Sequence, residues 1–251
     1  MNQMSQMNTI IIVSHYSKSR PKKDIKWVAK FTKLGFHTLI YDHISSNVSS
    51  LYSVPENKGR EASVYLKYMI DFYDSLQMYS AFIQDDEESW HHKGSIVKLV
   101  KDLVGTDIKY KNMNNRCLST IEPNNLYPMM VNYFNKCLKS YIGPIEKYGD
   151  WTAGYKCCAQ FIVHRDLIHK YPKKMYENMY RYMMDEKHNE KAKGHMFEWT
   201  LHLLFDNPYL MHKMSEKEFK TIMTDRKKTI DEAKDNKENV EFDGCRLIVD
   251  Y

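Results

Sequence analysis

The sequence predicts an α/β domain in which helices flank a mostly parallel central sheet. Three short apolar runs have the length and composition of buried strands, at residues 10–15, 37–43 and 79–84. Segments with helical spacing of apolar residues alternate with these runs, at 24–34, from about Arg60 onward, and at 95–104. Because strands that alternate with helices pair in parallel through right-handed crossovers, this order favours one parallel sheet.

The second half of the chain is predicted to be mainly helical. We expect helices at 126–142, 165–184 and 195–205, with strands at 116–121 and 155–163. No internal repeat or low-complexity linker divides the chain, so we expect one domain with a helical C-terminal part over residues 1–212. The charged segment 213–251 is expected to be helical, to end in a short strand and to pack on the same domain.

The composition excludes several classes of protein. The 251 residues are 43% hydrophobic and 27% charged, and no apolar stretch approaches the ~20 residues that cross a bilayer. The net charge of +5 is small and evenly spread, so we expect no nucleic-acid partner. The five cysteines lack zinc spacing, and the first apolar run precedes its basic residues, which together favour reduced thiols and a cytoplasmic protein. The sequence leaves the oligomeric state open.

Acidic residues gather directly after the third predicted strand, from Asp85 to Glu88. In parallel sheets, ligands bind outside the carboxyl ends of the strands. Adjacent carboxylates repel each other unless a cation balances them, and Mg²⁺ and Mn²⁺ commonly bridge carboxylates to a diphosphate. The alternative is a solvated acidic turn that caps the following helix.

A basic turn precedes the helix that begins near Arg60. Asn57, Lys58 and Arg60, with Gly59, place two cations and several backbone N–H groups at the helix N-terminus. Such a terminus binds phosphate readily, although an ordinary Asn/Gly turn with solvated side chains is the alternative. The chain offers, in order, a strand, this basic turn with its helix, and a strand that ends in acidic residues. Together these elements indicate a diphosphate site.

The predicted late helix carries a polar stripe on an otherwise apolar surface. His195, Glu198, His202 and Asp206 recur at i, i+3, i+7 and i+11. We expect His202 and Asp206 to face solvent. His195 and Glu198, placed at the helix start after Gly194, face either solvent or a cleft.

These segments, taken in order, resemble the donor half of glycosyltransferases with the GT-A fold, where an Asn/Gly turn and helix precede a strand that ends in a D-x-D-type metal motif. They also resemble a little-characterised domain family with N-x-G-R-E-A, F-[IL]-H and S-W-H segments. Here NKGREASVYL (57–66) matches the first segment, and FIQDDEESWHH (82–92) matches the strand that ends near S-W-H. Between them, DFYDSL (71–76) matches the end of that family's tyrosine-rich helix, which has a Y-x-x-L-like pattern. That family's later segments are A-Q-F-x-V, R-x-x-I-x-x-x-P-x-x-x-Y and E-x-x-W-h-x-I-F, and they match AQFIV (159–163), RDLIHKYPKKMY (165–176) and EWTLHLLF (198–205). Leu201 stands where the family's Trp is expected, and the acids offer D-x-E spacing instead of a literal D-x-D.

The resemblance implies a GT-A-like, Rossmann-like domain that moves a sugar from a UDP- or GDP-sugar to a glycan or glycoprotein acceptor with the help of Mn²⁺ or Mg²⁺. It implies metal ligands among Asp86, Glu88 and His195. Asp85 and the basic turn would contact the donor, and Glu198 would be the base that deprotonates the acceptor hydroxyl. A non-catalytic carbohydrate- or partner-binding module remains an alternative, as does a metal-dependent phosphohydrolase or nuclease.

Further candidates follow from their positions at strand ends. His15 and Tyr16 end the first strand, where such folds hold the nucleotide base, and Asp42 ends the second, where a carboxylate commonly contacts base or ribose.

Three more residues are candidates for sugar and acceptor contacts. Trp90 and His91 could stack on or hydrogen-bond a sugar ring, or belong to a loop with one anchored Trp. Gln160 is either an acceptor contact or an ordinary strand residue.

Overall fold

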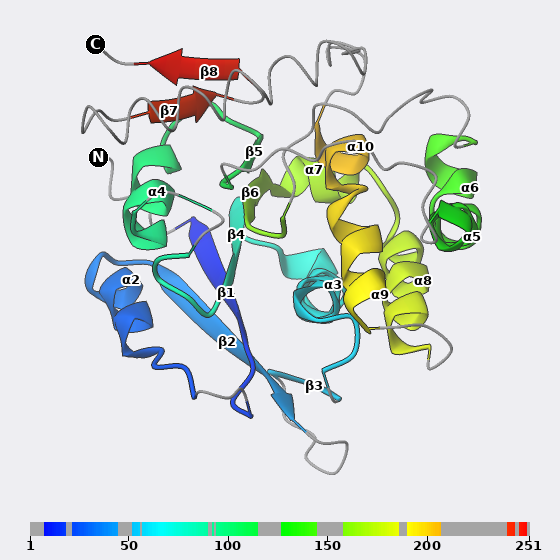
Figure 1. The fold of residues 1–251 in the computed structure, drawn as a ribbon, viewed down its shortest axis with the longest axis horizontal. Coiled ribbons are helices and arrows are strands. Elements are labelled where there is room, and N and C mark those ends of the chain that lie inside the picture. The colour runs from blue at the N-terminus through cyan, green and yellow to red at the C-terminus, as the bar shows by residue number, and fades with distance from the viewer. Residues whose placement is uncertain are drawn as a thin grey trace.

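The computed structural model describes residues 8–18, 22–44, 52–55, 57–89, 92, 94–114, 127–144, 158–185, 190–206, 240–243 and 246–249. Within these residues, helices cover both faces of a central sheet (Figure 1). The predicted α/β architecture is therefore confirmed.

The central sheet has the strand order β3-β2-β1-β4-β6-β5. Its strands are β1 (Thr9–His15), β2 (His37–Ile44), β3 (Ser53–Pro55), β4 (Tyr79–Gln84), β5 (Tyr110–Asn112) and β6 (Phe161–His164). The pairs β1–β2, β2–β3 and β1–β4 are parallel, whereas β6 runs antiparallel to both β4 and β5. The sheet is thus mostly parallel, as predicted, with an antiparallel edge.

Alternation along β1 explains why the sheet is covered on both sides. All seven residues of β1 are buried. Ile10 and Ile12 belong to the core on one face, and Ile11 and Val13 belong to the core on the other. Because successive strand residues point to opposite faces, a continuous apolar run requires a layer on each side.

The helices form these two layers (Figure 1). The smaller layer contains η1 (Lys26–Val28), α2 (Ala29–Lys33) and α4 (Ile96–Leu103). The larger layer is built around α3 (Glu61–Asp71), η2 (Tyr73–Ser75), α5 (Tyr127–Cys137), α6 (Lys139–Ile142), α7 (Arg165–His169), α8 (Lys173–Met184), α9 (Glu190–Glu198) and α10 (Leu201–Phe205).

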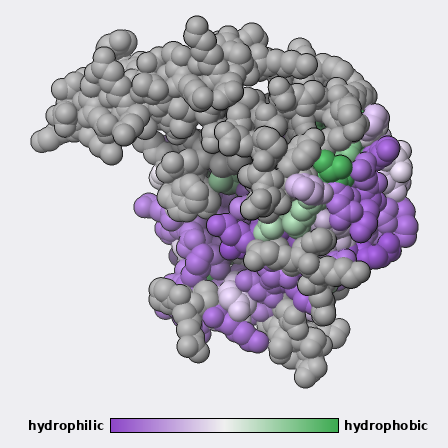
Figure 2. All heavy atoms as spheres, turned by 45° about the vertical axis from the view of Figure 1, so that its right-hand side comes forward, coloured by the Kyte–Doolittle hydropathy of each residue, from purple (hydrophilic) through white to green (hydrophobic). Residues whose placement is uncertain are grey.

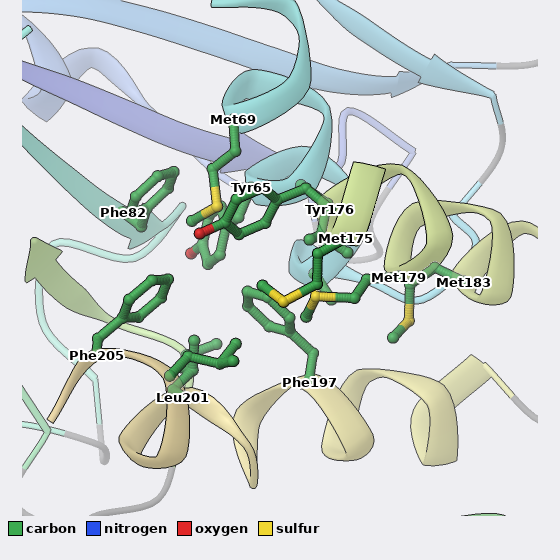
Figure 3. Close-up of a cluster of buried hydrophobic side chains, with 14 of the residues drawn as sticks. Tyr65, Met69, Phe82, Met175, Tyr176, Met179, Met183, Phe197, Leu201 and Phe205 are labelled. Carbon is green, nitrogen blue, oxygen red and sulfur yellow. The ribbon is translucent and has the colours of Figure 1, made fainter. Parts of the chain in front are cut away.

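The larger core is rich in tyrosine and methionine (Figure 3). Tyr65 of α3 lies 5.0 Å from Phe82 of β4 and 6.4 Å from Phe197 of α9, measured between ring centroids. Met175, Met179 and Met183 recur every four residues on α8 and are fully buried. Flexible thioethers adapt to irregular spaces between rigid rings, which suits a core built from both.

Three predicted helices are broken in the structure. The segment 126–142 forms α5 and α6, which are separated at Leu138. The segment 165–184 forms α7 and α8, because Pro172, which has no backbone N–H, is the N-cap of α8. The start predicted for the helix at 195–205 was wrong. Helix α9 begins at Glu190 and ends at Glu198, and α10 follows the turn Trp199–Thr200. His195 and Glu198 therefore lie in the last turn of a helix, not in its first.

The interrupted helix also changes the polar stripe. His202 is 6% exposed, so the expectation that it faces solvent was wrong, whereas Asp206 is exposed. The hydroxyl of Thr200 donates to the carbonyl oxygens of Met196 and Phe197, which ends α9 and turns the chain.

The remaining differences concern short strands. Strands β3 and β5, of three residues each, were not predicted, and the strand expected at 155–163 is shorter and begins at Phe161. The predicted last strand is β8 (Arg246–Val249), which pairs antiparallel with β7 (Val240–Asp243). The strand predicted at 116–121 and the helix predicted at 215–239 lie outside the described residues.

The described surface in Figure 2 is mostly hydrophilic and has one small hydrophobic patch. None of the described helices is long and apolar enough to cross a membrane.

Candidate functional site

The order in which successive strands are added to the sheet reverses between β3 and β4. Strands β2 and β3 follow β1 on one side, and the chain then returns to place β4 on the other side of β1. Ser14 of β1 is in register with Gln84 of β4, so the carboxyl ends of these two strands lie together. A crevice opens at such a topological switch point, because the connections leave in opposite directions.

A cavity of about 300 Å³ lies at this switch point. Its walls come from the carboxyl ends of β1, β2 and β4, from the turn before α3, and from the segment after β1. The lining residues are Ser14, Tyr16, Lys23, His43, Asn57, Arg60, Glu61, Gln84, Asp85 and Asp86. The structure thus brings together five of the predicted site residues, namely Tyr16, Asn57, Arg60, Asp85 and Asp86.

A lysine joins the two aspartates of this cavity. The Nζ atom of Lys23 lies 2.6 Å from Oδ1 of Asp85 and 2.6 Å from Oδ2 of Asp86. Burial by itself lowers the pKa of Lys23, but its hydrogen bonds to Asp85 and Asp86 outweigh that effect and leave the pKa raised. The ammonium group therefore stays charged and neutralises part of the acidic pair.

Asp85 is held in place by the end of β1. Its side chain is only 8% exposed. One oxygen, Oδ2, lies 3.1 Å from Nδ1 of His15 and accepts a hydrogen bond from the backbone N–H of Tyr16 at 3.2 Å. The predicted candidates His15 and Tyr16 thus fix the orientation of a third, Asp85.

The basic turn before α3 has an unusual backbone. Gly59 has φ of +65°, and the Cβ of any other residue there would lie 2.9 Å from Cβ of Met183. Arg60 has φ of 52°, which is uncommon for a residue with a side chain and costs about 1–3 kcal/mol. Strain of this kind clusters at functional sites. Lys58 is half-buried and is absent from the residues that line the described cavity.

A carboxylate from α9 accepts a hydrogen bond from the backbone of this turn. The N–H of Gly59 donates to Oε2 of Glu190, while Oε1 of Glu190 lies 2.8 Å from Nζ of Lys193. Lys193 is fully buried and also donates to the carbonyl oxygen of Asp185 at 2.7 Å. The start of α9 is therefore tied to the turn that carries Asn57 and Arg60.

Buried amides support the cavity from within the sheet. Gln84 donates from Nε2 to Oε1 of Glu61 at 2.7 Å, and its backbone N–H donates to Oε1 of Gln160 at 3.3 Å. Gln160 donates in turn to Oδ1 of Asn114 at 3.2 Å. Because Gln160 is fully buried and does not line the described cavity, the structure places it as a support for Gln84.

His195 and Glu198 are not among the described residues that line this cavity. A Cβ added to Gly194 would meet the carbonyl oxygen of Gly59 at 3.5 Å, so this part of α9 packs against the basic turn. The ring of His195 stacks on Trp199 at 5.3 Å. Burial, followed by the positive charges of Lys191 and Arg60, lowers the pKa of His195.

Tyr65 connects the cavity electrostatically to Glu198. Burial raises the pKa of Tyr65 well above its ordinary value, and the negative charges of Glu61, Asp85 and Glu198 raise it further. Two of the three carboxylates that line the cavity, Glu61 and Asp85, thus act on the same phenol as Glu198.

A second cavity, of about 660 Å³, adjoins the first at Lys23. It lies between β2 and the segment from the end of β1 to α2. Its lining combines apolar and charged side chains: His15, Ser17, Lys22, Lys23, Asp24, Ile25, Lys26, Val28, Ala29, Thr32, Thr38, Ile40 and Asp42. Asp42, a predicted candidate, accepts a hydrogen bond from the backbone N–H of Ser17 at 3.0 Å.

The predicted metal ligands Asp86, Glu88 and His195 do not form one group. Among the described residues, no three His, Cys, Asp or Glu side chains are placed to hold a metal ion, and Glu88 is exposed. Magnesium, however, is commonly bound by one or two carboxylates together with substrate phosphates. Asp85 and Asp86 already share a cation, the ammonium of Lys23, so a divalent cation that binds together with substrate phosphates would be held by this pair.

Several residues of the cavity were not predicted from the sequence. Gln84 is the last residue of a predicted strand and Glu61 directly follows Arg60. Both could therefore have been predicted from their positions. His43 ends the predicted strand at 37–43, so its position was a signal as well. Lys23 carried no signal, because only the tertiary structure brings it to Asp85. Trp90 and His91 lie outside the described residues.

The fold and this cavity define an α/β protein with a charged cavity at a topological switch point. The chain matches the model of the family described as "Protein of unknown function (DUF3431)" over residues 11–221, and it belongs to that family. The comparison with curated proteins found no match, and neither did the comparison with solved structures.

Proposed function

We propose that the protein is a GT-A-type glycosyltransferase that moves a sugar from a UDP- or GDP-sugar to a glycan or glycoprotein acceptor. The observation that carries this proposal is the cavity at the switch point, which is lined by the cations of Lys23 and Arg60 and by the carboxylates of Asp85 and Asp86. Open α/β sheets bind nucleotides at this place, and a diphosphate needs cations around it.

The charges of the cavity favour a donor that binds together with a divalent cation. Two cationic side chains, Lys23 and Arg60, face three carboxylates, those of Glu61, Asp85 and Asp86. The lining is therefore slightly negative, and a diphosphate entering alone would meet repulsion. Mn²⁺ or Mg²⁺ held by Asp85 and Asp86 would supply the missing positive charge and stabilise the departing diphosphate.

The adjoining cavity has the size and lining for a nucleoside. Apolar side chains such as Ile25 and Ile40 offer a surface for a flat base, and Asp42 offers a carboxylate for hydroxyl groups. Because Lys23 lines both cavities, a nucleotide lying across the two would place its diphosphate beside this ammonium group.

The acceptor would enter from the side of α9. A carboxylate near the acceptor hydroxyl takes up its proton as the bond to the sugar forms, and Glu198 is the candidate for this role. Arg60 would stabilise the negative charge that develops on the leaving diphosphate, while the sugar carbon passes through an oxocarbenium-like state.

Calorimetry with a panel of UDP- and GDP-sugars tests the proposal. We expect binding in the presence of Mn²⁺, its loss in Asp86→Ala, and its retention in Asp166→Ala, a control at an exposed carboxylate on α7. If no nucleotide sugar binds the wild-type protein with or without metal, the proposal is wrong.

A second candidate function is a carbohydrate- or partner-binding module without catalysis. It is favoured by one observation, that neither Glu198 nor His195 is among the described residues that line the cavity. Turnover of a labelled donor by the wild-type protein, lost in Glu198→Gln, would exclude this alternative.

A further inference from the structure

The contact between Lys23 and the two aspartates has the geometry of a bridging cation. Its ammonium nitrogen is equally distant, at 2.6 Å, from one oxygen of Asp85 and one oxygen of Asp86. Coulomb attraction is strongest where one cation touches two carboxylates, so this is the position at which the acidic pair binds positive charge most favourably.

The two partners of Lys23 are not equally exposed. Asp85 is buried, and His15 and the N–H of Tyr16 fix its orientation through contacts that do not involve Lys23. The side chain of Asp86 is 42% exposed and that of Lys23 is 35% exposed. Because a lysine has a long flexible stem, its ammonium group can leave the pair while the carboxylates stay near their positions.

Lys23 also lies where a released ammonium group would be useful. It lines both the cavity of the acidic pair and the adjoining cavity. An ammonium group has three N–H donors, so Lys23 can turn to phosphate oxygens without moving its backbone.

We propose that Lys23 is an exchangeable cation. It holds Asp85 and Asp86 in the ligand-free protein, gives way to a divalent cation when the donor binds, and then pairs with the diphosphate. This inference rests on the proposed function, since it assigns a role to Lys23 in binding the metal and the donor at the same site.

The exchange predicts effects of opposite sign when the positive charge of Lys23 is removed. In Lys23→Met the acidic pair has lost its competing cation, so the metal should bind more tightly. The same variant lacks a cation for the diphosphate, so the nucleotide should bind more weakly once the metal is in place. A lysine that served only to hold the fold would weaken both.

Titration calorimetry on the full chain measures both effects. For Lys23→Met we expect the affinity for Mn²⁺ alone to rise by about tenfold, and the affinity for UDP or GDP at saturating Mn²⁺ to fall by about tenfold. The matched control is Lys30→Met, which removes a lysine paired with Glu87 at 2.7 Å and absent from the lining of both cavities. It should leave both affinities unchanged.

A second measurement keeps Lys23 in the protein, so its result does not depend on whether Lys23→Met folds. The lysines are ¹³C-methylated, which preserves their charge, and the signals of Lys23 and Lys30 are assigned with Lys→Arg variants. Addition of Mg²⁺ should shift the Lys23 signal and leave the Lys30 signal in place. An unmoved Lys23 signal at a concentration where Mg²⁺ binds overturns the exchange.

The outcomes for the exchange and for the proposed function are distinguishable. An unchanged or reduced Mn²⁺ affinity in a folded Lys23→Met variant overturns the exchange. An increased Mn²⁺ affinity combined with no binding of UDP or GDP by the wild-type protein supports competition between Lys23 and the metal, but contradicts the role in donor binding and the proposed function.

Discussion

The charged cavity and the tyrosine- and methionine-rich core meet along α3 but are built in opposite ways. The cavity consists of strand ends and turns whose polar groups are paired, as Lys23 is with Asp85 and Asp86. The core is made of side chains such as Tyr65 and Met179, which are fully buried (Figure 3). Stability should therefore depend mainly on the core, whereas ligand binding should depend on the cavity. The predictions that follow test this division, from the largest expected effect to the smallest.

Phe82→Ala should have the largest effect on stability. Phe82 is fully buried and contacts Tyr65 and Phe161, with ring centroids 5.0 Å and 4.8 Å away. Removal of its ring leaves a cavity in the core and should cost about 3–5 kcal/mol in the free energy of unfolding. Urea denaturation measures this cost, and a loss below 1 kcal/mol would show that the core is not packed as described.

The pH dependence of stability should reveal the buried histidine of α10. Burial lowers the pKa of His202 to about 3, so the folded protein keeps this ring neutral, while the unfolded chain protonates it near 6.5. The unfolded state then binds more protons as the pH falls, which destabilises the fold by roughly 2–3 kcal/mol between pH 6.5 and 4.5. Unfolding curves for the wild type and His202→Leu should differ in this pH range, with a flatter profile for the variant. Identical slopes would contradict the burial.

Glu190→Ala tests the link between α9 and the basic turn. The substitution removes the partner of the buried Lys193 ammonium and of the Gly59 N–H. Because Glu190 is itself partly exposed, we expect a loss of about 1–2 kcal/mol. The control is Glu177→Ala, at an exposed pair with Lys174, which should change stability by less than about 0.5 kcal/mol. Equal effects of the two substitutions would rule out the link.

Tyr65→Phe should have the smallest effect and the opposite sign. Within the described part of the chain, the Tyr65 hydroxyl is buried and has no hydrogen-bond partner. Its removal should leave stability unchanged or increase it by up to about 1 kcal/mol. The matched variant Tyr68→Phe loses a hydrogen bond to Ser80 at 3.2 Å and should be destabilised. A clear destabilisation by Tyr65→Phe would indicate that this hydroxyl has a partner.

The sequence was sufficient to predict the parallel part of the sheet and the grouping of several cavity residues. The apolar runs that became β1, β2 and β4 are continuous, and their order places Tyr16 and Asp85 at one edge. The turn before α3 could also be predicted, because an Asn/Gly turn with cations at a helix start is recognisable from the local sequence.

Features that depend on contacts between distant residues could not be predicted. Lys23 reaches Asp85 across 62 positions of the chain, and Glu190 reaches Gly59 across 131. The start of α9 was misplaced because Gly194 was interpreted as a helix boundary. In the structure it lies inside the helix and allows a close approach to Gly59 and Arg60.

The most direct test of the central claim is a crystal structure of the protein grown with Mn²⁺ and a UDP- or GDP-sugar that binds in calorimetry. The account predicts that the diphosphate lies in the switch-point cavity between Arg60 and the Asp85–Asp86 pair, with the nucleoside in the adjoining cavity near Asp42. A nucleotide sugar bound elsewhere on the protein, with this cavity unchanged, would contradict it.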